Sequence, residues 1–388
     1  MSITKRPGIY FTETTEYELQ GNGGKIPVII GKTGNSAATG YKVDGTQINK
    51  FNGWSEVNRS IANGGIGTDT STNPLLAFLK DFFEEAEPRT GEEVGVPYIY
   101  VIDVGAGTSK DVWLAALTTA KTKRDAIIEY YVSPESITDD GYTLSTFIAA
   151  AAASIATETS NLNLRTGFTT KDSATDAQLI ALNPTSGGIL KSRIGIIEPL
   201  KAGKHFAMLC CTPYYLEPGF LPYRTVEPGT FKDRTDAEIL ALQNAGIIFG
   251  VDEHVSDLTV CRINLAVSTA FAASPRPSDA LLHARFNADN LLRNVFKAVF
   301  TQVKANESAS YIVKAQTKVD AVIDEEVRAE RMIEYNSDTG DGTKLDLKES
   351  DSNPYDMILE GQIQGINCTI AINVKVKIKN PAMIAASS

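Results

Sequence analysis

The sequence predicts a mixed α/β protein of more than one domain, in which central αβ sandwich domains lie between extended N- and C-terminal β arms. A chain of 388 residues exceeds what one ordinary hydrophobic core supports. Apolar strand-like runs alternate with helical patterns through the middle of the chain, which favours a mostly parallel sheet covered by helices. Strand-forming segments also occur near both ends, outside this alternation.

Residues 1–24 are predicted to form an extended arm. They are polar and glycine-rich, and they end in Gly21–Gly24. The segment Gly8–Thr14 within them is rich in strand formers but has neither a turn nor a nearby strand to pair with. A strand on such a flexible linker has to find its partner elsewhere.

Residues 25–104 form the first predicted αβ segment, which we expect to pack with the C-terminal part of the chain. An apolar run at Ile26–Ile30 predicts a buried strand. A helix is expected from Leu75 with Asn73 as its N-cap, followed by a second buried strand over Pro97–Ile102.

Residues 105–260 form the predicted middle αβ domain. Its proline-rich stretch Pro213–Pro228 is interpreted as an ordered excursion from regular structure. Helices are expected at 109–121, 143–156 and 236–244, and strands at 126–132, 193–197, 206–210 and 247–249. Strands and helices of this length in alternation again indicate a mostly parallel sheet.

Residues 261–388 are predicted to form a C-terminal domain of helices and strands that ends in an extended arm. Long helices are expected from Ser278 and over 318–335. Apolar and polar residues then alternate strictly over 366–378, and at ~3.3 Å per residue such a strand would span roughly 43 Å. Ordinary strands are about half as long, so this one either crosses a large sheet or reaches beyond its own domain. Its apolar positions are Ile366, Cys368, Ile370, Ile372, Val374, Val376 and Ile378.

The overall charge argues against nucleic acid as a partner. The chain has 37 Lys and Arg and 47 Asp and Glu, which gives a net charge of −10, and such a surface is poorly suited to neutralising phosphates. The four cysteines form no C-x-x-C pair and are interpreted as small buried hydrophobes of a protein made in a reducing cytoplasm. We expect no signal peptide and no membrane span, because no apolar stretch reaches the required ~20 residues.

Two glycine-containing turns partly match phosphate-binding loops. Gly105 and Gly107 follow a predicted strand and open a predicted helix, as in a dinucleotide fingerprint, but Lys110 stands where the third glycine belongs. The turn after the first strand ends like a Walker A loop at Gly31, yet Ile26 occupies the place of the first glycine. Glycine permits tight turns without any ligand, so both segments are interpreted as turns, and no cofactor is expected.

No other pattern indicates catalysis or metal binding. Asp338–Gly340 spells the aspartic-protease triplet, but its polar neighbours mark a solvated loop. His205, His254 and His283 are scattered, with no second ligand at metal-binding spacing, and Asp252–His254 is interpreted as a solvent-facing loop. The sequence therefore predicts a protein that is not an enzyme and has no metal site.

The segment Arg6–Glu13 resembles the Pro-Gly-Val-Tyr-x-x-Glu opening of contractile tail sheath proteins, found in phages and related injection systems. Further segments agree with that family in the same order. Ile26–Gly34 is similar to the family's next strand and turn, and Ile48–Phe51 with Trp54–Glu56 is similar to its short edge segment. The segments that resemble the family are short motifs, and together they extend over about half of the chain.

Two later segments resemble the family with departures. Leu76–Phe83 followed by Tyr98–Val101 is similar to its helix before a strand, although Asp103 stands near the place of a usual Arg. Glu238–Phe249 is similar to its helix ending in Gly-Ile-Asn, with Ile248 in place of Asn.

The resemblance implies a structural subunit that polymerises helically around an inner tube and contracts to drive the tube through a target envelope. Sheath subunits are described as adding strands from their arms to the sheets of neighbours, a case of β-augmentation. The implied partners are copies of the chain, the inner tail tube protein, and baseplate and tail terminator proteins, with no nucleic acid and no membrane insertion. The implied location is a virion tail or injection-system particle assembled in the host cytoplasm. The implied strand arms contain Pro7, Gly8, Ile9, Tyr10, Phe11, Ile370, Ile372, Val374, Val376 and Ile378.

Two alternatives stay open at the level of sequence. Another tail or capsid assembly protein, such as a tube or baseplate subunit, would share the acidity and the strand exchange, although the predicted helices count against a small β-rich tube protein. A nucleotide-binding α/β enzyme would use Gly105 and Gly107.

Overall fold

The computed structural model describes twelve stretches of the chain, which form two compact units. The larger unit lies within Asn22–His283, and the described part of the smaller one lies within Ala284–Ser388. The described residues are 24–33, 42–66, 73–89, 95–139, 141–160, 163–182, 193–255, 258–272, 281–300, 309–350, 353–365 and 372–378.

The division into units differs from the expected boundaries at residues 104 and 260. Strand β1 (Pro27–Gly31) pairs in parallel with β3 (Ile99–Asp103) on one side and with β4 (Ile128–Val132) on the other. A boundary after residue 104 would separate β1 from β4 and leave buried backbone groups without partners. The first αβ segment and the middle domain therefore form a single unit.

Seven strands of the larger unit form one sheet in the order β2-β3-β1-β4-β5-β6-β7. Every neighbouring pair is parallel except β2 and β3, which confirms the predicted mostly parallel sheet. The remaining strands are β2 (Ile48–Phe51), β5 (Thr166–Thr169), β6 (Ile194–Ile197) and β7 (Ile247–Ile248).

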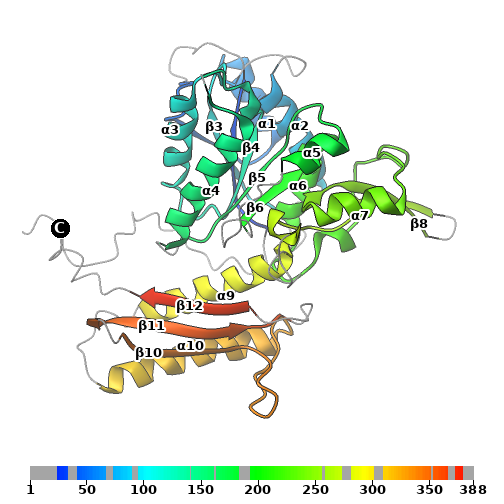
Figure 1. Cartoon of the computed structure of the whole chain (residues 1–388). Helices are drawn as coiled ribbons and strands as arrows, with labels where there is room; N and C mark the ends of the chain where they lie inside the picture. Colours follow the sequence, from blue (N-terminus) through cyan, green and yellow to red (C-terminus); the bar gives the residue numbers. More distant parts are fainter. Residues whose placement is uncertain are drawn as a thin grey trace, which may run out of the picture. The chain divides into compact units, whose positions relative to one another are not determined.

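Helices cover both faces of this sheet (Figure 1). On β4, Tyr131 packs against Phe147 of α4, whereas Tyr130 contacts Phe78 of α2 and Phe206 of α6. Successive side chains of a strand point to opposite faces, so α4 lies on one face and α2 and α6 on the other. Two covered faces explain why the strands are apolar throughout. The helices are α2 (Pro74–Ala86), α3 (Lys110–Ala120), α4 (Leu144–Ser160) and α6 (Ala202–Cys211).

Helix α6 occupies a segment for which the sequence predicted a strand, at 206–210, and that prediction is wrong. All residues of α6 are buried, and it packs closely on α2, since a Cβ added at Gly203 would lie 2.5 Å from the carbonyl oxygen of Phe78. A helix buried on all sides shows no amphipathic period. Its apolar run therefore cannot be distinguished from a buried strand.

Smaller elements complete the larger unit. The hairpin of β8 (Gly250–Val255) and β9 (Leu258–Ile263) contains Asp252–His254, which the sequence analysis interpreted as a loop. The interpretation was wrong because a strand with solvent on one face carries polar residues. The helices are α1 (Trp54–Ala62), α5 (Asp176–Ala181) and α7 (Asp236–Asn244), and the 3-10 turns are η1 (Glu87–Arg89), η2 (Pro134–Ser136), η4 (Pro218–Phe220) and η5 (Thr269–Ala272).

The smaller unit combines two helices with an antiparallel sheet in the order β10-β11-β12. Helix α10 ends before the predicted residue 335, because Glu330 adopts a left-handed backbone conformation with φ +56°. The elements are α9 (Leu282–Phe300), α10 (Ala309–Arg328), β10 (Lys344–Ser350), β11 (Asn353–Ile363) and β12 (Ile372–Ile378).

Among the described residues, no helix combines the length and the apolar character that crossing a membrane requires. Three of the four cysteines, Cys210, Cys211 and Cys261, are buried and free, as predicted. Burial raises the pKa of the Cys211 thiol to about 12, so this side chain stays a neutral thiol. Cys368 and Ser278 lie outside the described residues.

Candidate functional site: sheet edges and a buried ion network

The smaller unit has a three-stranded sheet with two edges. Its middle strand β11 is paired on both sides, whereas β10 and β12 are each paired on one side only. Within the described part of the chain, no strand pairs with the second side of β12. An edge strand carries backbone N–H and C=O groups that can bind another strand, so the two edges are candidate assembly sites.

Strand β12 pairs with β11 of its own chain. The register sets Ile372 opposite Ile363 and Val376 opposite Leu359. Ile363 and Leu359 are buried, with 2% and 0% of their surface exposed, so apolar positions of β12 stand opposite buried positions of β11. Residues 372–378 thus pair within their own chain, whereas the resemblance implied an arm that adds a strand to a neighbour's sheet. Residues 364–371, between the strands, make a short connection, and closing a short loop costs little entropy.

The structure describes only part of the predicted strand arms. The positions within β12 are Ile372, Val374, Val376 and Ile378. Pro7, Gly8, Ile9, Tyr10, Phe11 and Ile370 lie outside the described residues. The role of both sets in joining subunits stays a prediction.

A side chain from α10 contacts the edge at β10. The side-chain amide of Gln316, on α10, donates from Nε2 to the carbonyl oxygen of Leu345 at 2.9 Å. Its Oε1 accepts from the N–H of Leu347 at 2.7 Å. Gln316 thus satisfies one backbone acceptor and one backbone donor on the outer side of β10.

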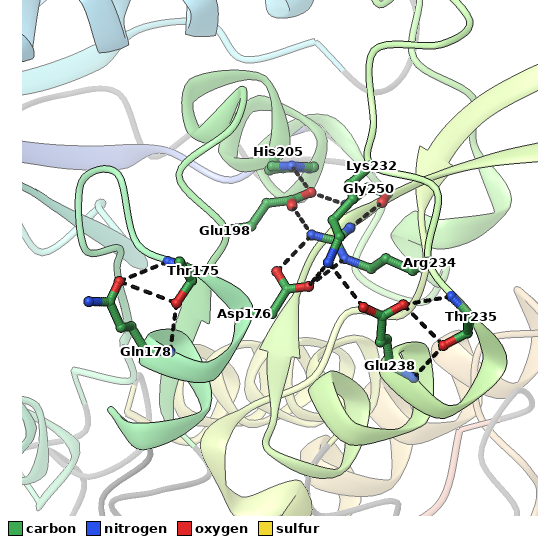
Figure 2. Close-up of polar contacts among 10 residues, drawn as sticks. All are labelled: Thr175, Asp176, Gln178, Glu198, His205, Lys232, Arg234, Thr235, Glu238 and Gly250. Carbon is green, nitrogen blue, oxygen red and sulfur yellow. Dashed lines mark hydrogen bonds and ion pairs between the residues drawn. The ribbon is translucent and has the colours of Figure 1, made fainter.

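The larger unit contains a buried ion network, which we define as Glu198, His205, Arg234 and Asp176 (Figure 2). Glu198 directly follows β6, and its Oε1 contacts Nε2 of His205 at 3.2 Å. Its Oε2 accepts from Nη2 of Arg234 at 2.8 Å, and the backbone N–H of Gly250 also donates to the carboxylate. The carboxylate therefore has a partner on each oxygen.

Arg234 connects this carboxylate to a second one. Its Nη2 donates to Oδ1 of Asp176 at 3.1 Å, and its Nη1 donates to the carbonyl oxygen of Gly250 at 3.3 Å. Each residue of the Arg234–Asp176 ion pair lies beside a capping box. Thr175 caps α5, whose first residue is Asp176. Thr235, which follows Arg234, caps α7. The network fixes β8 and α5 at the end of β6.

Two members of the ion network, Glu198 and His205, are enclosed by other groups of the chain. His205 also contacts the hydroxyl of Tyr223 through Nδ1, which gives a Tyr-His-Glu chain. His205 has 0% of its surface exposed and Glu198 has 2%, so no substrate could reach either group without a rearrangement. Sequence reasoning missed the network; the two capping-box patterns were the only signals, and they indicate helix starts but not an ion pair.

Burial alone would raise the pKa of Glu198, but its partners outweigh burial. The hydrogen bond and charge of His205, the charge of Arg234 and the Gly250 N–H together lower the pKa of this carboxyl below its ordinary value. The hydrogen bond from Arg234 likewise lowers the pKa of Asp176. Both carboxylates are thus more acidic in the folded protein than in the unfolded chain.

We expect Glu198→Gln to destabilise the larger unit and to reduce its sensitivity to acid. A carboxyl with a lowered folded-state pKa stabilises the fold above the unfolded pKa of about 4.5, and this contribution disappears as the pH falls through the folded value. Removing one partner of a buried ion pair costs about 3–5 kcal/mol at neutral pH. Urea unfolding between pH 3 and 7 measures both effects.

The exposed Glu227 offers a matched control for this prediction. Glu227→Gln should unfold like the native protein at every pH. If Glu198→Gln loses stability with acid as steeply as the native protein does, Glu198 is not a source of the acid sensitivity.

The glycine turn after β3 is occupied by groups of the chain itself. Gly105 and Gly107 have φ values of +59° and +65°, which explains the choice of glycine. The N–H of Gly105 donates to the carboxylate of Asp103 at 2.7 Å. At the start of α3, where a phosphate would bind, the N–H of Lys110 donates to the carboxylate of Asp139.

The three histidines lie in different environments. His205 belongs to the ion network, His254 is exposed on β8, and His283 contacts the buried carboxylate of Glu217 at 2.5 Å. Among the described residues, no group of three or more His, Cys, Asp and Glu side chains could hold a metal ion.

Several solved structures have a fold similar to that of this chain. No protein-family model and no curated protein matches the chain. The sheath tail protein of Desulfitobacterium hafniense is 10% identical, with 96% of this chain and 100% of that chain covered and a TM-score of 0.62. The sheath tail protein of Listeria innocua is 8% identical, with 92% of this chain and 96% of that chain covered and a TM-score of 0.63. The contracted helical sheath of the anti-feeding prophage is 12% identical, with 97% of this chain and 96% of that chain covered and a TM-score of 0.59.

The chain therefore has the fold of contractile sheath proteins, which confirms the fold that the resemblance implied.

Proposed function

We propose that this chain is a structural subunit of a contractile sheath that polymerises helically around an inner tube and shortens to drive the tube through a target envelope. The fold carries the proposal, because the likeness to the contracted sheath of the anti-feeding prophage extends over 97% of this chain and so includes both units. A protein with this function needs no catalytic site.

In the proposed assembly step, a strand from another copy is added to the second side of β12, with which no described strand pairs. A strand that joins an open edge gains backbone hydrogen bonds along its length, and this gives affinity without a deep pocket. We assign the added strand to Gly8–Thr14 of a neighbouring copy, since these residues favour a strand and are linked to the body by glycines. A donor and an acceptor surface at different places make a heterologous contact, which propagates into a helix and does not close.

Glycine-rich linkers, which the sequence predicts to be flexible, would allow the lattice to change while the added strands stay paired. In the proposed cycle, subunits assemble in an extended lattice that persists because its conversion is slow. A trigger then lets them relax into a shorter lattice with more contact between copies. The energy is stored during assembly, so no nucleotide is required.

The further partners in the proposal are an inner tube protein, a baseplate and a tail terminator. The net charge of −10 makes nucleic acid a poor ligand for the surface. The particle would be a phage tail or an injection system assembled in a host cytoplasm.

Negative-stain electron microscopy of the purified chain tests the proposal. We expect hollow helical tubes at high protein concentration, because each added copy presents a new free edge. Single subunits at every concentration, with and without the tube protein, would contradict a sheath. Millimolar NAD or ATP should leave the melting temperature unchanged, whereas a rise would favour a nucleotide-binding enzyme, since a ligand of the native state stabilises it.

A further inference from the structure

The outer side of β10 is closed by one side chain from a helix. Helix α10 packs on β10, and Leu345 and Leu347, the residues that contact Gln316, are buried, with 1% and 6% of their surface exposed. Nε2 of Gln316 also lies 2.8 Å from Oδ1 of Asp320, one helical turn further along α10. This second contact fixes the orientation of the amide, so that nitrogen faces Leu345 and oxygen faces Leu347.

The two bonds of Gln316 match those of a residue in a parallel neighbouring strand. Such a residue donates its N–H to the carbonyl of position i−1 and accepts from the N–H of position i+1. Gln316 does the same with Leu345 and Leu347, on either side of Asp346. The side chain therefore occupies two of the backbone groups that an added strand would need.

Two open edges on one sheet would give each copy two places for strand addition. An unprotected edge pairs with any available strand, and proteins close such edges by covering or charging them. Within the described residues, β12 pairs with β11, and no strand pairs with its second side. At β10, Gln316 therefore leaves an incoming strand fewer backbone groups to bind.

We infer that Gln316 guards the β10 edge against strands from a second copy of this chain, so that free subunits accept strands at β12 and not at β10. The part of the inference that concerns strand addition at β12 rests on the proposed function, whereas protection of β10 requires only an edge that would otherwise pair with another chain. In this inference, Gln316 helps to determine at which edge of the sheet a strand from another copy is added.

Substitution of Gln316 tests the inference by hydrogen exchange and sedimentation of the full chain. In Gln316→Ala at low concentration, the Leu347 amide should exchange about tenfold faster than in the native protein, since one hydrogen bond is lost. As the concentration rises, Gln316→Ala should self-associate and the same amide should become protected again. Recovered protection that depends on concentration identifies β10 as the place of association.

Two further variants separate edge protection from general destabilisation. Thr317→Ala changes the next residue of α10, whose hydroxyl bonds only to Val313 of the same helix, and should behave like the native protein. Gln316→Glu keeps an acceptor for the Leu347 N–H, loses the donor to Leu345 and places a charge at the edge, so it should stay unassociated.

Equal association of Gln316→Glu and Gln316→Ala would overturn the inference, and so would a Gln316→Ala chain whose Leu347 amide stays exposed at high concentration. Both of these outcomes concern the β10 edge and not the tubes expected from the proposed function. If the native protein forms no tubes but Gln316→Ala associates through β10, the proposed sheath function fails while the guard at β10 stands.

Discussion

A chain that lacks residues 1–20 is expected to fold and to stay soluble but to form no tubes. The deletion removes Gly8–Thr14, the strand that we assign to the free side of β12 in a neighbouring copy. Both compact units keep their described elements, which begin at Pro27. Circular dichroism and thermal unfolding should therefore change little, whereas electron microscopy should show single subunits.

A shorter deletion provides the control. Removing residues 1–5 leaves Gly8–Thr14 in place and should leave tube formation intact. Adding a synthetic peptide of residues 6–16 to the longer deletion should block the free side of β12 and should not restore tubes, because a separate peptide cannot link two copies. Tubes of normal appearance from the longer deletion would show that the N-terminal arm is not the donor.

Gly361→Ala is expected to disrupt the three-stranded sheet and, with it, assembly. Gly361 lies in the middle of β11, opposite Leu345 on β10 and Val374 on β12. Its φ is +155°, and an added Cβ would lie 2.0 Å from the carbonyl oxygen of Lys344. Overpacking and backbone strain at such a site cost roughly 2–5 kcal/mol together.

Hydrogen exchange of β10 and β11 measures this effect, because faster exchange should be confined to the smaller unit. Gly340→Ala is the matched control: Gly340 also has a positive φ, of +74°, but no atom lies within 4 Å of an added Cβ. It should cost only the backbone strain, about 1–2 kcal/mol. If Gly361→Ala forms normal tubes and exchanges like Gly340→Ala, the close approach of β10 and β11 is not essential.

Much of the larger unit could be predicted because its signals are local. Asn73 was expected as an N-cap, and its side chain accepts from the N–H of Leu76 at 2.9 Å. The apolar runs at Ile26–Ile30 and Pro97–Ile102 correspond to β1 and β3. Strand β5 was missed, since its four residues, Thr166–Thr169, are buried but mostly not apolar.

The candidate site could be predicted only in part. Alternation at 366–378 indicated a strand, and residues 372–378 form β12. The ion network could not be found, because Asp176, Glu198, His205 and Arg234 come from segments that meet only when β6, α5 and β8 are in place. Gln316 precedes the helix predicted at 318–335, although α10 begins at Ala309, and no sequence signal relates it to β10.

The sequence by itself determined several helices and strands of the larger unit, among them β1, β3 and α2, and it determined that the strands of that unit run mostly parallel. Periodicity carries this information because it records how one segment is buried, residue by residue. The tertiary structure alone decided the partner of β12, the single sheet that spans residue 104, and the closure of one edge by Gln316. Each of these depends on contacts between segments far apart in the chain, and a local pattern records burial but not the identity of the neighbour.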